Sequence, residues 1–93
     1  MKKQIFRQRE VTLEVDIDKT IKVTAKGYSK QAVAVSVPGE NSQKFTMDGT
    51  VMPILEVDKK NLSGEITVSV STYDVLSIKK GLFGVKVTEL ASM

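Results

Sequence analysis

The chain has 93 residues, of which 41% are hydrophobic and 27% charged, with a formal net charge of +3 and neither Cys nor His; this length predicts a single domain over residues 1–93 with one modest core. The missing residue types exclude disulfides, thiolate metal sites and imidazole-based catalysis, and the mild positive charge permits a polyanionic partner without requiring one. No apolar run reaches the roughly 18 residues of a membrane span, and no apolar segment follows the basic start as a signal peptide requires, so we expect a cytoplasmic protein with no membrane partner.

The N-terminal half begins with a basic segment and continues with alternating residues. Residues 1–9 form a candidate basic arm, with positive side chains at Lys2, Lys3, Arg7 and Arg9. Apolar residues then occupy every second position over 11–17 and again over 21–26, on either side of the turn Asp18-Lys19-Thr20. A period of two with a short turn predicts a hairpin of two half-buried strands.

The middle of the chain adds further strand signals. Residues 32–37 carry small side chains on one face, which favours a central strand covered on both sides. Residues 44–47 and 50–57 flank Asp48-Gly49, a dipeptide typical of two-residue hairpin turns. Pro53 lies inside the second arm and has no N–H to donate, so we expect that arm at a sheet edge or at a bulge.

The C-terminal third continues in the same way. A polar loop over 58–64 precedes a strand at 66–70. Residues 71–78 fit either a further strand or a short helical turn. Lys79-Lys80-Gly81 is expected to turn the chain into a last strand that begins at Phe83.

Short strands with turns every eight to twelve residues, and no helical period, predict an all-β domain. We expect five to seven strands in a small, partly open barrel of OB type. An SH3-like barrel or a small sandwich are the alternatives. Barrel closure would remove strand edges that otherwise aggregate.

The chain lacks the common catalytic and phosphate-binding motifs, including a Walker loop and a GxGxxG sequence. We therefore expect no enzyme, no cofactor, no metal site and no catalytic residue, and predict a protein that acts by binding.

Basic residues are interleaved with aromatic residues at two places. Lysines can neutralise phosphates, and exposed aromatic rings can stack on unpaired bases. The pattern therefore indicates a site for single-stranded nucleic acid. Its members are Lys26, Tyr28 and Lys30 in one segment and Lys79, Lys80 and Phe83 in the other. The structural alternative is that Tyr28 and Phe83 are buried in the core and that the lysines only keep the loops soluble.

Two stretches, Gly64 to Val75 followed by Gly81-Leu82-Phe83-Gly84, and Lys26-Gly27-Tyr28-Ser29, resemble the small single-stranded DNA-binding proteins of filamentous phages. Those proteins are OB-like barrels that dimerise and coat the viral strand without strong sequence preference. The resemblance implies that Tyr28 stacks on bases, that Phe83 lies at the tip of a dimer loop and that Tyr73 lies on the same hairpin. Lys26 would lie near the basic wing. Residues 33–40 resemble accessory DNA-replication proteins of conjugative elements, which also implies a mobile element.

Two hypotheses thus carry equal weight. The first is a phage or mobile-element protein that binds single-stranded DNA through Lys26, Tyr28, Lys30, Tyr73, Lys79, Lys80 and Phe83. The second is a phage structural protein or protein-binding inhibitor that uses residues 50–57 as an exposed strand edge. A small-ligand carrier or enzyme subunit with an interior cavity is a third. Homodimerisation is expected under the first two, because pairing exposed edges stabilises a small domain.

Overall fold

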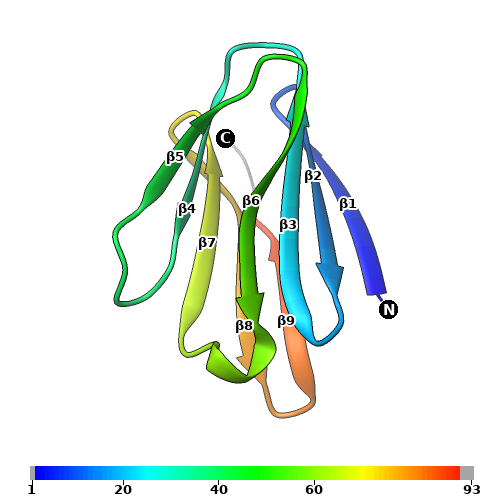
Figure 1. Cartoon of the computed structure of the whole chain (residues 1–93), viewed down its shortest axis with the longest axis vertical. Helices are drawn as coiled ribbons and strands as arrows, with labels where there is room; N and C mark the ends of the chain where they lie inside the picture. Colours follow the sequence, from blue (N-terminus) through cyan, green and yellow to red (C-terminus); the bar gives the residue numbers. More distant parts are fainter. Residues whose placement is uncertain (1, 91–93) are drawn as a thin grey trace.

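Two antiparallel β-sheets make up the chain in a computed structural model that describes residues 2–90 (Figure 1). The first sheet has the strand order β1-β2-β3-β6. Its strands are β1 (Lys2–Gln8), β2 (Val11–Ile17), β3 (Thr20–Gly27) and β6 (Thr50–Asp58). The second sheet has the order β5-β4-β7-β8-β9. Its strands are β4 (Ala32–Ser36), β5 (Gln43–Thr46), β7 (Glu65–Val70), β8 (Tyr73–Gly81) and β9 (Gly84–Glu89).

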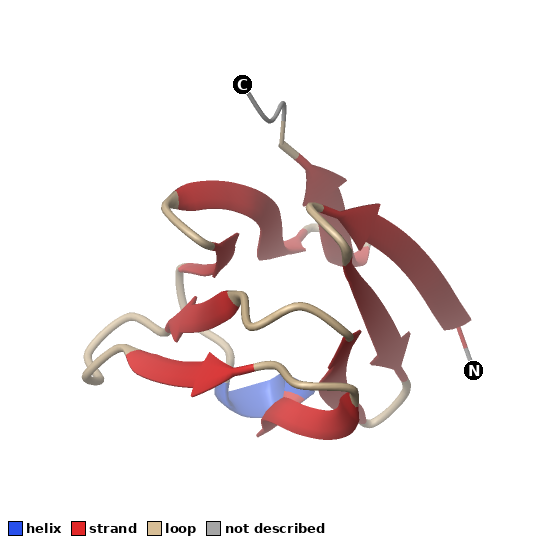
Figure 2. Cartoon of the chain, turned by 90° about the horizontal axis from the view of Figure 1, so that it is seen from above, coloured by secondary structure: helices blue, strands red, loops and turns tan. Residues whose placement is uncertain are grey.

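The chain crosses between the two sheets three times, after β3, after β5 and after β6. As a result β3 pairs with β6 in one sheet and β4 pairs with β7 in the other. Such crossed connections are typical of Greek-key β-sandwiches. The view from above shows the two layers with the connections between them, and the single 3-10 turn η1 (Lys59–Asn61) below (Figure 2).

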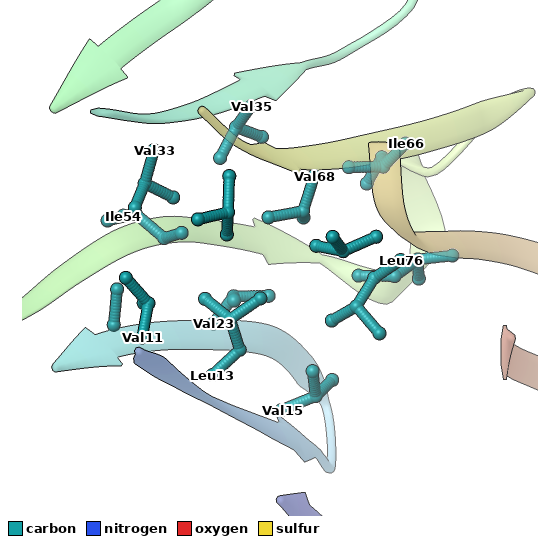
Figure 3. Packing of buried hydrophobic residues seen from close by; sticks show 14 of the residues in the cluster. Val11, Leu13, Val15, Val23, Val33, Val35, Ile54, Ile66, Val68 and Leu76 are labelled. Carbon is teal, nitrogen blue, oxygen red and sulfur yellow. The ribbon is translucent and has the colours of Figure 1, made fainter. Parts of the chain in front are cut away.

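The core lies between the inner faces of the two sheets. Alternation along β2 and β3 buries one face of each strand and leaves the other face to solvent. Aliphatic residues of both sheets meet in the middle (Figure 3). Fully buried members include Leu13, Val15, Ile21, Val23, Val33, Ile66, Val68, Leu76 and Ile78. Each such side chain contributes about 1.5–3 kcal/mol by leaving water, so a β-branched core supports the sandwich without tryptophan.

The structure confirms the all-β fold class. The predicted number of five to seven strands was too low, because residues 2–90 contain nine, and these form two sheets as in the small sandwich that the sequence allowed. The hairpin of β2 and β3 and the interior position of β4 in its sheet are also confirmed. The predicted cover on both faces of β4 was wrong, because Ala32 and Ser36 on its outer face are exposed. The predicted edge position of residues 50–57 is confirmed because β6 is the last strand of its sheet. The register between β3 and β6 shifts next to Pro53, where Val23 faces Leu55 and Thr24 faces Pro53.

Three local predictions were wrong. Residues 44–47 and 50–57 do not form a hairpin, since β5 pairs with β4 and the chain changes sheets at Met47 to Gly49. Burial of the Met47 side chain holds that crossover in place. Lys79-Lys80-Gly81 is no turn, because β8 runs on to Gly81 and the turn is Leu82-Phe83. Residues 2–8 form the edge strand β1 instead of a basic arm.

No helix within residues 2–90 has the length and apolar character needed to cross a membrane.

Candidate binding surfaces

The seven residues predicted to bind nucleic acid lie at two opposite ends of the sandwich (Figure 1). Lys26, Tyr28, Lys30 and Tyr73 lie at the end where β3 leads into β4 and β7 turns into β8. Lys79, Lys80 and Phe83 lie at the far end of β8, on the hairpin with β9. Tyr73 and Lys80 are seven residue steps apart along one strand, which is about 23 Å at a strand rise of 3.3 Å. The structure therefore divides the predicted site into two separate surfaces.

The first surface is the tyrosine end, defined here by Arg9, Lys26, Tyr28 and Tyr73. Tyr28 is 77% exposed, and the ammonium group of Lys26 lies 5.7 Å from the centre of its ring. The ring of Tyr28 also leans on Gly49, where an added Cβ would lie 3.6 Å from Cδ1 of the tyrosine. Tyr28 therefore presents an aromatic face to solvent beside a positive charge.

The second tyrosine of this end is already engaged. The guanidinium carbon of Arg9 lies 3.4 Å from the centroid of the Tyr73 ring, which covers one face of that ring. The same end carries exposed carboxylates at Glu10, Asp48 and Asp74. Their charges oppose the attraction of a polyanion, so the tyrosine end is of mixed charge rather than a basic patch.

The second surface is the hairpin tip, defined by residues 81–84 between β8 and β9. The side chains of Leu82 and Phe83 are 97% and 102% exposed. The tip is thus fully apolar and fully in water. Flanking residues Gly81 and Gly84 face each other across the turn, and Gly84 adopts φ +126°, which residues with side chains rarely do.

Lysines surround the base of the hairpin tip. Lys79 lies directly opposite Lys86 in the antiparallel register, and Lys80 lies opposite Val85. Like charges placed directly across two strands destabilise the pair. One of them is compensated, since the ammonium of Lys79 lies 3.3 Å from a carboxylate oxygen of Glu65.

The carboxylate of Glu65 also accepts a hydrogen bond from the neighbouring strand β8. The hydroxyl of Ser77, which is buried, donates a hydrogen bond of 2.7 Å to Oε2 of the carboxylate. This hydrogen bond and the neighbouring Lys79 hold the pKa of Glu65 below its ordinary value of 4.5, because both favour the charged form.

A groove opens along the side of the sandwich between the edge strands β5 and β6. Its volume is about 380 Å³, and it continues into a second depression of about 320 Å³ toward η1. The strand order leaves one side of each edge strand without a sheet partner. Its lining is both apolar and polar. The apolar residues are Val35, Val37, Phe45, Pro53, Ile54, Leu55 and Val57, and the polar ones are Glu40, Asn41, Gln43 and Glu56.

The rim of the groove is acidic. Glu40 and Glu56 line both depressions, and Asp58 lines the lower one. Of the residues that the structure describes, no Lys or Arg lines either depression. The sequence indicated the β6 wall as an exposed strand edge but missed the β5 wall, because these two segments were expected to pair with each other.

Within residues 2–90, no three acidic side chains come together in a group that could hold a metal ion. No protein-family model, no curated protein and no solved structure matches this chain. The resemblance to the filamentous-phage proteins thus rests on the sequence stretches 26–29, 64–75 and 81–84 alone.

Proposed function

We propose that the chain is a non-catalytic protein-binding module that takes an extended segment of a partner into the groove between β5 and β6. The observation that carries this proposal is a groove with an apolar strip along it that lies between two edge strands, each with one side free of a sheet partner. A phage structural protein or an inhibitor would use such a module.

Strand addition explains why this surface binds peptide backbone. An extended peptide gains main-chain hydrogen bonds from an exposed edge and places alternate side chains into pockets. Pro53 lacks a donor and the register shifts beside it, so pairing along β6 is confined to the segment after the irregularity. That segment, Leu55 to Asp58, carries the acidic rim, which favours a partner with basic residues.

The proposal is tested with a synthetic eight-residue peptide of alternating Val and Lys, titrated into isotope-labelled protein. We expect backbone amide shifts confined to β5, β6 and their neighbours. A matched peptide with Pro at every second position cannot add a strand, and a Val–Glu peptide has the wrong charge. Both should bind at least about tenfold more weakly.

Glu56→Lys provides the matched protein control, since Glu56 is exposed and its replacement leaves the core intact. This substitution should weaken binding of the Val–Lys peptide and strengthen binding of the Val–Glu peptide. Shifts that map to the tyrosine end or the hairpin tip, or no shifts at millimolar peptide, would refute the proposed function.

Single-strand binding at the tyrosine end is the second candidate, favoured by the exposed ring of Tyr28 beside Lys26. Fluorescence anisotropy of a labelled single strand of roughly 20 nucleotides would report it, with affinity that falls as salt rises. Tyr28→Ala should weaken binding about tenfold, the value of one stacked base. Phe83→Ala, at the opposite end, should have no effect. Absence of binding at micromolar protein in low salt would eliminate this candidate.

A further inference from the structure

We infer that the groove between β5 and β6 receives the hairpin tip of a second copy of this chain. The inference rests on the groove being a protein-binding site, as proposed above, and names a partner that enters it with the side chains of a hairpin tip instead of by strand addition. Each copy then carries a knob, residues 81–84, and a socket, the groove of the preceding subsections.

The knob is unusual because its two apolar side chains lie in solvent instead of packing against the rest of the chain. Leu82 and Phe83 occupy the turn of a two-stranded hairpin, where polar turn residues are the norm. Both are almost completely exposed. Their contact with water is unfavourable in free energy, and burial against a second surface would remove that penalty. Since β8 and β9 extend to the turn itself, the knob is presented on a regular hairpin.

The socket has the size and lining that these side chains need. A dry cavity of about 150 Å³ suffices for a benzene ring, so a groove of about 380 Å³ has room for the Phe83 ring and the Leu82 side chain together. Its lining of Val35, Phe45 and Leu55 is of the same aliphatic and aromatic chemistry as the knob.

Charge decides in favour of a second copy over an arbitrary apolar partner. The knob is flanked by Lys79, Lys80 and Lys86, and the socket is rimmed by Glu40 and Glu56. Apolar centres of matching chemistry with complementary charged borders on both sides are what a specific interface requires. The acidic rim would also balance the charge of Lys86, which lies opposite Lys79 in the register, while Lys79 itself is already paired with Glu65.

Knob and socket lie on different parts of the chain, since β8 and β9 are at the opposite side of the second sheet from β5. A contact between unlike surfaces is heterologous and builds rings or filaments, unless two copies exchange knobs reciprocally.

The test uses exposed positions only, so that folding is preserved. Light scattering of the intact chain across micromolar to millimolar concentration should show association. The knob variant Lys80→Glu with Lys86→Glu, and the socket variant Glu40→Lys with Glu56→Lys, should each self-associate at least about tenfold more weakly. A mixture of the two variants should associate again, because each knob then finds a socket of opposite charge on the other variant.

A second readout uses the absence of Trp from the chain. Phe83→Trp places a single indole in the knob, and its emission should shift to the blue as protein concentration rises. Tyr28→Trp, at the far end, should not shift. Leu82→Ser with Phe83→Ser should abolish association without changing the melting temperature.

A chain that stays monomeric at millimolar concentration would overturn the inference, and so would variants that fail to complement each other. If the Val–Lys peptide still shifts β5 and β6 in that case, the proposed function stands and the groove serves a foreign partner. If the chain associates through the tip but the peptide causes no shifts, the proposed function fails. If, in addition, mixing the socket variant with the knob variant does not restore association, the tip binds to a surface other than the groove.

Discussion

The guanidinium of Arg9 lies over the ring of Tyr73, so the turn between β1 and β2 in one sheet contacts the first residue of β8 in the other. Next to it, the side-chain amide of Gln8 donates a hydrogen bond to the carboxylate of Glu89 at the end of β9. Polar contacts therefore link the two sheets on the side of β1 and β9. On the opposite side, between β5 and β6, the sandwich is open as the groove.

Removing the Arg9 side chain should loosen this link. Cation–π contacts contribute about 0.5–1 kcal/mol at exposed sites and up to about 2 when desolvated, and Tyr73 is more than half covered. We expect Arg9→Ala to lower the free energy of unfolding by about 1 kcal/mol in urea titration. A double-mutant cycle with Tyr73→Leu isolates the contact, and Tyr73→Phe should be close to neutral. A coupling energy near zero would mean that the two residues are only neighbours.

The turn that carries Arg9 should become more stable with glycine at its second position. Arg9 and Glu10 have φ values of 50° and 70°, the left-handed region that a type I′ turn needs and that glycine favours. Glu10→Gly should raise the free energy of unfolding by about 0.5–1 kcal/mol, measured as a higher urea midpoint. Asp18→Gly, in the turn between β2 and β3 where no φ is positive, is the matched control and should give no gain.

Gly27 is required at the end of β3 for a different reason, which is space. A Cβ at this position would lie 3.2 Å from both Met47 Cβ and Val11 Cγ2, and Gly27, Met47 and Val11 are all buried. Gly27→Ala should therefore destabilise the protein by about 1–3 kcal/mol through overpacking. Combined with Val11→Ala, which makes room for the added methyl group, Gly27→Ala should cost less free energy of unfolding than it does alone, so the double variant should be more stable than the sum of the two single losses predicts. Gly81→Ala, where the nearest atom is 3.4 Å away, should be much milder.

The sequence predicted strands well where one face is buried. Alternation in β2 and β3 follows directly from burial on one side, so the period identified both strands and their hairpin. Pro53 identified an edge strand because a missing N–H is compatible only with a position at an edge or bulge. In contrast, Asp48-Gly49 resembles a hairpin turn locally, but the chain passes to the other sheet there, with Met47 buried in the core and its N–H bonded to the carbonyl of Gln31.

The candidate site was less predictable because it depends on which ends of strands meet. Tyr73 and Lys80 are close in sequence, yet one extended strand separates their positions, so they cannot share a small site. The division would have followed from the sequence if residues 71–78 had been taken as a strand throughout. The groove depends on long-range pairing of β5 with β4 and of β6 with β3, which local patterns do not encode.

The carboxylate of Glu65 gives the stability a defined pH dependence. Its pKa is lowered in the folded protein by the hydrogen bond from Ser77 and by Lys79, so folding favours the charged form. The stabilisation is fully present above the unfolded pKa, near 4.5, and is lost as the pH falls through the lower folded value. Glu65→Gln should therefore lower the urea midpoint at pH 7, and its effect should become smaller as the pH falls below 4.5. In a Ser77→Ala background this pH-dependent difference should shrink, because the principal donor is gone. An equal effect of Glu65→Gln at both pH values would contradict the assignment.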